Sequence, residues 1–169
     1  QEAIDKHVEH SFQAFGHIPE IRLEYGGLCV SRNELTLAEK QAADLLSQDK
    51  TNVRAMNLLS RVFMKRGEFD KAVKVLEGAN ILSPDQPGRL ILLGDAFYGQ
   101  GDTKKAAACY DKALEQDPDN QEAVNKLGQI KLNEGDVNAL LELWSNHGSE
   151  SEKAGFFNNA AVALSLIHI

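Results

Sequence analysis

The sequence has few of the residues on which several protein classes depend. Its two cysteines, Cys29 and Cys109, lie far apart and outside any CxxC or His/Cys spacing, so neither a disulfide framework nor a zinc site is expected. No apolar run reaches the roughly 18 residues that a membrane-spanning helix requires. The N-terminus also lacks the pattern of a signal peptide. These absences predict a protein of the reducing cytoplasm, and a first residue Gln1 in place of Met predicts a piece of a longer chain.

Positive charge is also scarce. The 169 residues carry a net charge of -7, with 18 basic against 25 acidic side chains. Nucleic acids and anionic membranes bind basic surfaces, so neither is an expected partner. The hydrophobic fraction of 43% is nevertheless sufficient for a continuous core, and the length suits one domain.

The residue patterns of catalysis are missing as well. No Ser/His/Asp arrangement, phosphate-binding glycine loop or convergent pair of acids is present. His7 and His10 share one helix face and His17 follows, but no further ligand joins them, and an exposed helix is favoured over a metal site. Both cysteines fall at packing places. We therefore expect no enzyme activity, no cofactor and no metal.

What the sequence does have is a period of 34 residues, which indicates a repeat protein. Like residues return at this distance in four pairs: Gly67 and Gly101, Ala72 and Ala106, Ala79 and Ala113, and Pro84 and Pro118. The period divides the chain into unit one (19–52), unit two (53–86), unit three (87–120) and unit four (121–154). Residues 1–18 then form a leader helix or linker, and residues 155–169 form the first helix of an incomplete fifth unit.

Each unit is predicted to be a pair of antiparallel helices. In unit three, spacings of three and four place Leu90, Leu93, Gly94 and Phe97 on one helix face. The second helix carries Ala106, Tyr110 and Ala113, and Pro118 ends it. Glycines in the turn 99–102 can adopt positive φ, and small residues at Gly94 and Ala106 are expected to let the two helices approach closely.

These residues resemble the tetratricopeptide repeat (TPR) family, in which Leu-Gly, an aromatic, Ala, an aromatic, Ala and Pro recur in each unit. Unit three matches this pattern throughout, unit two matches with Ser60 in the glycine place, and units one and four match more weakly. The resemblance implies an all-α fold, a right-handed superhelical solenoid of antiparallel helix pairs. It also implies a concave groove, lined by the first helices, that binds a peptide or helix of another protein.

Family-typical groove places are the second, fifth, ninth, twelfth and thirteenth of each unit. They give the following candidates: Arg54, Asn57, Arg61, Met64 and Lys65 in unit two, Ile91, Asp95 and Tyr98 in unit three, and Asn125, Gln129 and Asn133 in unit four. Asparagine can both donate to and accept from a peptide backbone, so Asn57 and Asn125 are the strongest single candidates.

Unit two is the one unit with a basic excess, six basic against four acidic residues. Arg54, Arg61 and Lys65 lie at spacings of seven and four, so they share a helix face that can receive an acidic side chain or a terminal carboxylate. The alternative is an ordinary solvated face.

Binding of chaperone C-terminal tails is not expected. Family members that bind such tails use Lys and Asn, then Asn, then Lys and Arg on three successive first helices. In the two possible registers this chain has Leu23, Gly27, Leu58, Ile91 and Asp95, or Asn57, Arg61, Leu92, Asn125 and Gln129. Neither set supplies the lysines.

Two further hypotheses concern the wider protein. Residues 79–84 and 157–163 resemble the TPR portion that follows a receiver domain in some bacterial response regulators, so a role as the output region of such a protein is the alternative function. The apolar residues 160–169 lack a partner helix, and solenoid ends are normally capped by a polar face, which predicts self-association through this segment. An accessory region of an enzyme is the least favoured hypothesis, because no chemistry is encoded.

Overall fold

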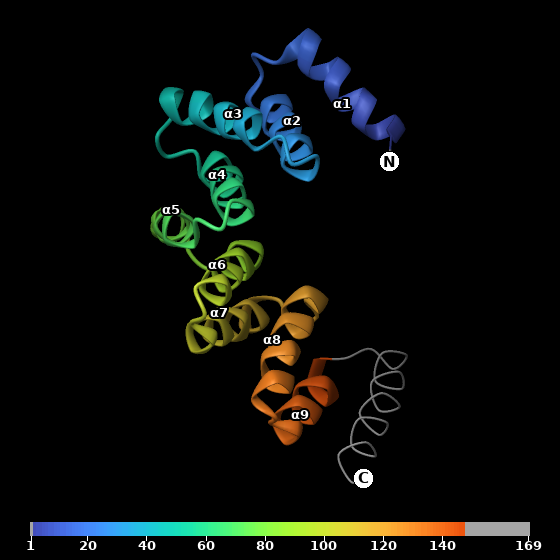
Figure 1. The fold of residues 1–169 in the computed structure, drawn as a ribbon, viewed down its shortest axis with the longest axis vertical. Helices are drawn as coiled ribbons and strands as arrows, with labels where there is room; N and C mark the ends of the chain where they lie inside the picture. The colour runs from blue at the N-terminus through green and yellow to red at the C-terminus, as the bar shows by residue number, and fades with distance from the viewer. Residues whose placement is uncertain (1, 148–169) are drawn as a thin grey trace.

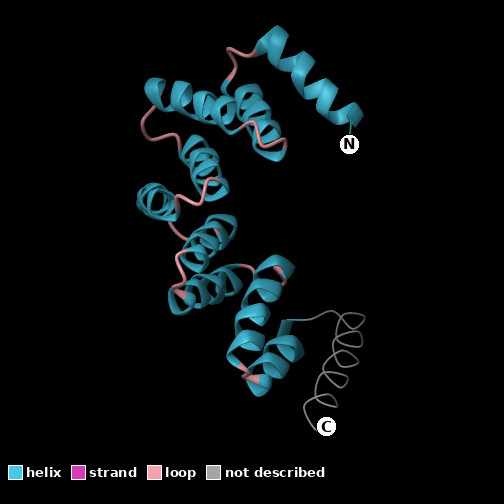
Figure 2. Ribbon diagram, in the orientation of Figure 1, coloured by secondary structure: helices cyan, strands magenta, loops and turns pink. Residues whose placement is uncertain are grey.

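The computed structural model describes residues 2–147, with side chains from residue 5 onward. These residues form nine helices and no strand: α1 (Glu2–Phe15), α2 (Pro19–Ser31), α3 (Leu35–Gln48), α4 (Val53–Lys65), α5 (Phe69–Leu82), α6 (Pro87–Gly99), α7 (Thr103–Gln116), α8 (Gln121–Glu134) and α9 (Val137–His147). Successive helices pack in antiparallel pairs along an arched stack (Figures 1 and 2). The all-α solenoid expected from the sequence is confirmed.

The helices start in step with the 34-residue period. First helices begin at Pro19, Val53, Pro87 and Gln121, and second helices begin at the seventeenth place of each unit, at Leu35, Phe69, Thr103 and Val137. Asn52 and Asn120 cap α4 and α8 by accepting hydrogen bonds from the N–H groups of Ala55 (3.0 Å) and Ala123 (3.1 Å). Even in unit four, where the sequence pattern is weak, α9 begins at the same place as its counterparts.

The turn inside each unit needs one residue with positive φ. This residue occupies the fifteenth place in all four units: Asn33 (63°), Gly67 (74°), Gly101 (84°) and Gly135 (73°). Glycine adopts this conformation without a steric cost, and asparagine is among the side chains that tolerate it best. The repeated glycine in the sequence therefore marks a backbone requirement of the turn.

The core is continuous from α5 to α8, with a second cluster around α2, α3 and α4. Glycines at the eighth place of a unit make room for large neighbours. A Cβ atom on Gly94 would lie 2.5 Å from Cε1 of Tyr110, and one on Gly128 would lie 3.1 Å from Nε1 of Trp144. The three atoms nearest to that Cβ of Gly94 all belong to the ring of Tyr110 on α7, so the absent side chain at Gly94 makes room for this tyrosine.

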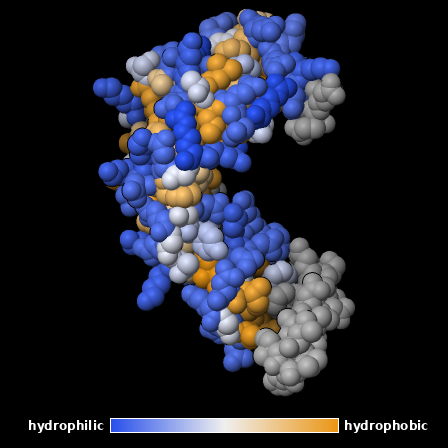
Figure 3. All heavy atoms as spheres, viewed as in Figure 1, coloured by the Kyte–Doolittle hydropathy of each residue, from blue (hydrophilic) through white to orange (hydrophobic). Residues whose placement is uncertain are grey.

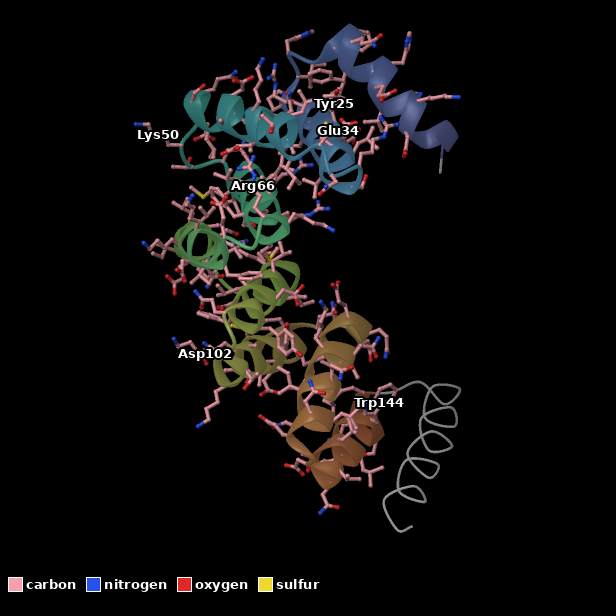
Figure 4. All side chains as sticks on the ribbon, in the orientation of Figure 1. Tyr25, Glu34, Lys50, Arg66, Asp102 and Trp144 are labelled. Carbon is pink, nitrogen blue, oxygen red and sulfur yellow. The ribbon has the colours of Figure 1, made fainter. Side chains whose placement is uncertain are left out.

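The leader helix α1 packs on α2 much as α3 packs on α4. Arg32 in the first turn pairs with Asp5 of α1 at 3.8 Å, and Arg66, one period later, pairs with Glu39 of α3 at 2.7 Å. The two pairs have the same sequence separation. Figure 4 labels Arg66, and it also labels Tyr25, whose ring stacks on Phe12 of α1 with centroids 4.0 Å apart. In position, α1 therefore corresponds to a second helix of the solenoid.

Two predictions lie outside the described residues: the fifth-unit helix at 155–169 and self-association through 160–169. Within residues 2–147, no helix combines the length and apolar character needed to cross a membrane.

Candidate functional site

A concave side is visible in the space-filling view, between the end of the molecule that carries α1 and α2 and the end that carries α8 (Figure 3). Helix α4 contacts both α2 and α6, so three first helices form one continuous wall. This contact brings together side chains from three different units, which is the arrangement expected of a peptide-binding groove.

The wall contains a hollow of about 270 Å³ between α4 and α6, called here the α4–α6 hollow. It is lined by Val30 of α2, by Arg61, Met64 and Lys65 of α4, by Phe69 at the start of α5, and by Leu92 and Asp95 of α6. Four of these residues, Arg61, Met64, Lys65 and Asp95, are candidates from the sequence. The fold thus places them in one cavity although they come from two units.

The three charged groups of the hollow have different environments. Arg61 and Lys65 are exposed, and neither forms an ion pair with a described residue. The carboxylate of Asp95, by contrast, accepts hydrogen bonds from Nζ of Lys126 (2.8 and 3.0 Å) and from the hydroxyl of Tyr110 (2.7 Å). Burial, together with this carboxylate, raises the pKa of Tyr110. The charge left available in the hollow is therefore positive.

Other candidates of the first helices lie beside the hollow or beneath it. Arg54 is 64% exposed and faces Glu20 of α2 at 4.0 Å. Asn57 is half-buried, and its Oδ1 accepts no hydrogen bond from any described group. Ile91 was predicted to face the groove, but it is 3% exposed and belongs to the core cluster. The fifth place faces inward in unit three, so Ile91 cannot contact a bound segment.

Unit four provides a second hollow of about 240 Å³ that contains Asn125 and Gln129. Its remaining lining consists of Gly128, Leu132, Leu140 and Trp144, and the last of these is labelled in Figure 4. The candidates Tyr98, Gln129 and Asn133 are linked to one another, because Gln129 donates to Asn133 (3.0 Å), which donates to the hydroxyl of Tyr98 (3.3 Å). This part of the wall is polar but internally hydrogen-bonded.

Several lining residues were missed at the sequence level. Val30 and Leu132 occupy the twelfth place, the same place as the candidates Met64 and Tyr98, so the period itself could have found them. Leu92 occupies the sixth place, which is not among the groove places used in the sequence analysis, and Phe69 comes from a second helix. For these two the sequence carries no signal.

Arg89 carries a charge that could suggest a binding residue, but its contacts give it a structural role. It is 4% exposed, and its guanidinium donates to the backbone carbonyl oxygens of Ala79 (2.9 Å) and Ser83 at the end of α5. Burial lowers its pKa from the ordinary value for arginine. The positive group at the C-terminal end of α5 complements that helix's dipole and ties unit two to unit three.

Among residues 2–147, the cysteines and histidines show no arrangement for chemistry. Cys29 and Cys109 are buried, and burial raises the pKa of both thiols. His7, His10 and His17 are exposed. Across residues 2–147 no three His, Cys, Asp or Glu side chains gather as a potential metal site.

Comparison with known families agrees with this geometry. Residues 30–87 match the family described as tetratricopeptide repeat, and residues 94–135 match the one described as TPR repeat. The two matches together cover more than half of the sequence. The chain belongs to the tetratricopeptide repeat family.

Individual relatives are more distant. The fission yeast (Schizosaccharomyces pombe) DnaJ homolog subfamily C member 7 homolog is 32% identical over 110 residues, which are 58% of this chain and 23% of that protein. The chain thus spans about a quarter of the length of this relative. Among solved structures, the Thermus thermophilus TPR protein TTC0263 has a TM-score of 0.79 at 16% identity, with 95% of this chain and 90% of that chain covered.

The second similar solved structure is a complex with a peptide. The first TPR of Spaghetti (RPAP3), bound to the HSP90 peptide SRMEEVD, has a TM-score of 0.63 at 19% identity, covering 69% of this chain and 93% of that one. At such identities the two solved structures establish the shared fold.

Proposed function

We propose that this chain is a non-catalytic interaction scaffold that holds an extended segment of a partner protein along the concave wall of α2, α4, α6 and α8. The observation that carries the proposal is the α4–α6 hollow, which exposes two cations beside an apolar floor on the inner side of the stack. The fold relative that holds a peptide supports the proposal by showing that a solenoid of this kind has room for one.

Free hydrogen-bonding groups on the wall support an extended ligand. The Oδ1 of the half-buried Asn57 is itself buried and has no partner among the described residues, so rotation of this amide toward the groove would let it accept an N–H from a bound backbone. Asn125 is exposed on α8 and can contribute an amide donor. An extended chain presents its own N–H and C=O groups at regular intervals, whereas a helix satisfies them internally.

Phage display of random peptides on the purified chain tests the proposal. We expect a family of binding peptides whose retention falls at least about tenfold when Met64→Ala and Leu92→Ala shorten two of the apolar side chains that line the hollow. The matched control carries Ile81→Ala and Leu82→Ala, which shorten two exposed side chains at the end of a second helix. Peptides that bind both variants alike, or no enrichment of any peptide, would reject a concave binding site.

The more specific hypotheses remain predictions. A role as the output region of a bacterial response regulator, a cytoplasmic location, self-association through residues 160–169 and lack of affinity for chaperone tails each need their own experiment. None of the described contacts favours the response-regulator hypothesis over the scaffold.

A further inference from the structure

We infer that the α4–α6 hollow is an anchor for an acidic side chain with an apolar neighbour in the bound segment. The inference rests on the proposed function and names the chemistry that the groove selects. Arg61 and Lys65 are four residues apart on α4, so they project from the same face and line the same cavity. A carboxylate between them can accept charge-assisted hydrogen bonds from both.

The cations of unit two differ in how they are engaged. Arg54 faces Glu20, Arg66 pairs with Glu39 at 2.7 Å, and Lys71 pairs with Glu68. Arg61 and Lys65 form no such pair with a described residue. Because Arg61 and Lys65 are the two cations that line the α4–α6 hollow, they provide the local attraction for an acid there.

The acid within the hollow does not cancel this attraction. Asp95 is held by Lys126, whose ammonium group lies 2.8 Å from one carboxylate oxygen and 3.0 Å from the other, and by Tyr110. Lys126 therefore offsets the charge of Asp95. With one ion pair compensated and two cations free, the hollow favours an anion over a neutral or basic side chain.

The apolar floor of the hollow is the reason to expect an apolar residue beside the acid in the bound segment. Val30 is 2% exposed, while Met64, Phe69 and Leu92 are half-buried at its surface. A side chain such as leucine can cover these groups, and the water it displaces strengthens the nearby contacts between carboxylate and cations. An acid adjacent to an apolar residue thus fits the lining better than an acidic run does.

The anchor also fixes the register of the partner. At the ninth place the other units have Gly27, Asp95 and Gln129 in place of Arg61. At the thirteenth place they have Ser31, Gly99 and Asn133 in place of Lys65.

In the four units, the pairing of two cations at these places therefore occurs once. A segment with a single acidic position would bind in one register. The net charge of -7 over the whole sequence opposes long polyanions, so a short acidic peptide is preferred over nucleic acid.

Two matched fluorescent peptides that differ in a single acid, GSGLEQLSGS and GSGLQQLSGS, test the anchor by fluorescence anisotropy. We expect the acidic peptide to bind at least about tenfold more tightly at low salt, with the preference shrinking as ionic strength rises. Arg61→Gln with Lys65→Gln should reduce the affinity for the acidic peptide to that for the neutral one. Lys40→Gln with Lys74→Gln removes the same charge from exposed places on second helices and should keep the preference.

Several results would overturn the anchor. Equal affinity for the two peptides, no binding of either, or an equal loss in the control variant would each do so, and so would displacement of the acidic peptide by a DNA duplex at lower concentration. The phage-display experiment tests the groove independently of the anchor. Peptides without acids that still depend on Met64 and Leu92 would leave the scaffold intact while removing the anchor. Circular dichroism of both variants confirms that the substitutions leave the helices folded.

Discussion

Units two and three have the same backbone and use it differently. At the ninth place unit two exposes Arg61 to the groove, whereas unit three has Asp95, which is bound to Lys126 and Tyr110. At the eighth place unit two has the buried Ser60, and unit three has Gly94, whose missing side chain is replaced by a tyrosine ring. At the third place Ala55 of unit two corresponds to the buried Arg89.

The comparison separates two uses of one repeat. The polar and aromatic side chains of unit three form contacts within the stack, so few charged groups on its part of the wall lack a partner. Unit two packs with small and aliphatic residues at the equivalent places, which leaves its cations available. If the proposed function holds, binding would depend on which units leave their groove places without internal partners.

The largest loss of stability is expected at Gly94 of unit three, where the ring of Tyr110 occupies the space that a side chain would take. Gly94→Ala places a Cβ against the ring of Tyr110, and overpacking of this kind costs about 1–3 kcal/mol of unfolding free energy. Gly78→Ala, in a helix where no atom lies within 4 Å of the added Cβ, should instead stabilise by up to about 1 kcal/mol. Urea denaturation measures both. Equal effects at the two sites would show that the space at Gly94 is not needed.

A somewhat smaller loss is expected at the junction of the two units. Arg89→Ala gives unit three the residue that unit two has at this place, and it removes the donor to the carbonyl groups of Ala79 and Ser83. We expect a loss of about 1–2 kcal/mol, because buried acceptors then lose their partner. Thermal unfolding followed by circular dichroism tests this, and an unchanged midpoint would mean that water replaces the guanidinium without cost.

The smallest expected effect is the dependence of the unfolding free energy on pH through Tyr110. The raised pKa of Tyr110 means that the folded state holds the phenolic proton more tightly than the unfolded state does. The contribution of Tyr110 is therefore constant below about pH 10 and falls above it, by at most about 1.4 kcal/mol per pH unit. Relative to Tyr110→Phe, the wild-type chain should lose about 1 kcal/mol of unfolding free energy between about pH 10 and 11. Parallel stability curves for the two proteins would contradict this.

Much of the fold follows from the 34-residue period, because turn and packing requirements return once per unit. The sequence predicted the helix pairs, the turn glycine Gly101, and the three residues that line the α4–α6 hollow from α4. It failed where a contact crosses between units. Arg89 looks like a surface residue until the end of α5 is placed beside it, and Ile91 looks like a groove residue until its neighbours bury it.

The site was predictable to the extent that it repeats. The places typical of the family located Arg61, Met64, Lys65 and Asp95, but the period carries no information on which charges are neutralised. That depends on Lys126, which lies in the next unit and reaches back to Asp95. Phe69 enters the hollow from a second helix, so a search restricted to first helices could not find it.

The most direct test of the account is photo-crosslinking with a peptide selected by display. A benzoylphenylalanine in place of Met64, on the wall of α4, is expected to form a crosslink to the bound peptide. The same residue in place of Ile81, which is 81% exposed near the end of α5, is expected to form none. Crosslinking at 81 without crosslinking at 64 would place the partner away from the first helices and contradict the account.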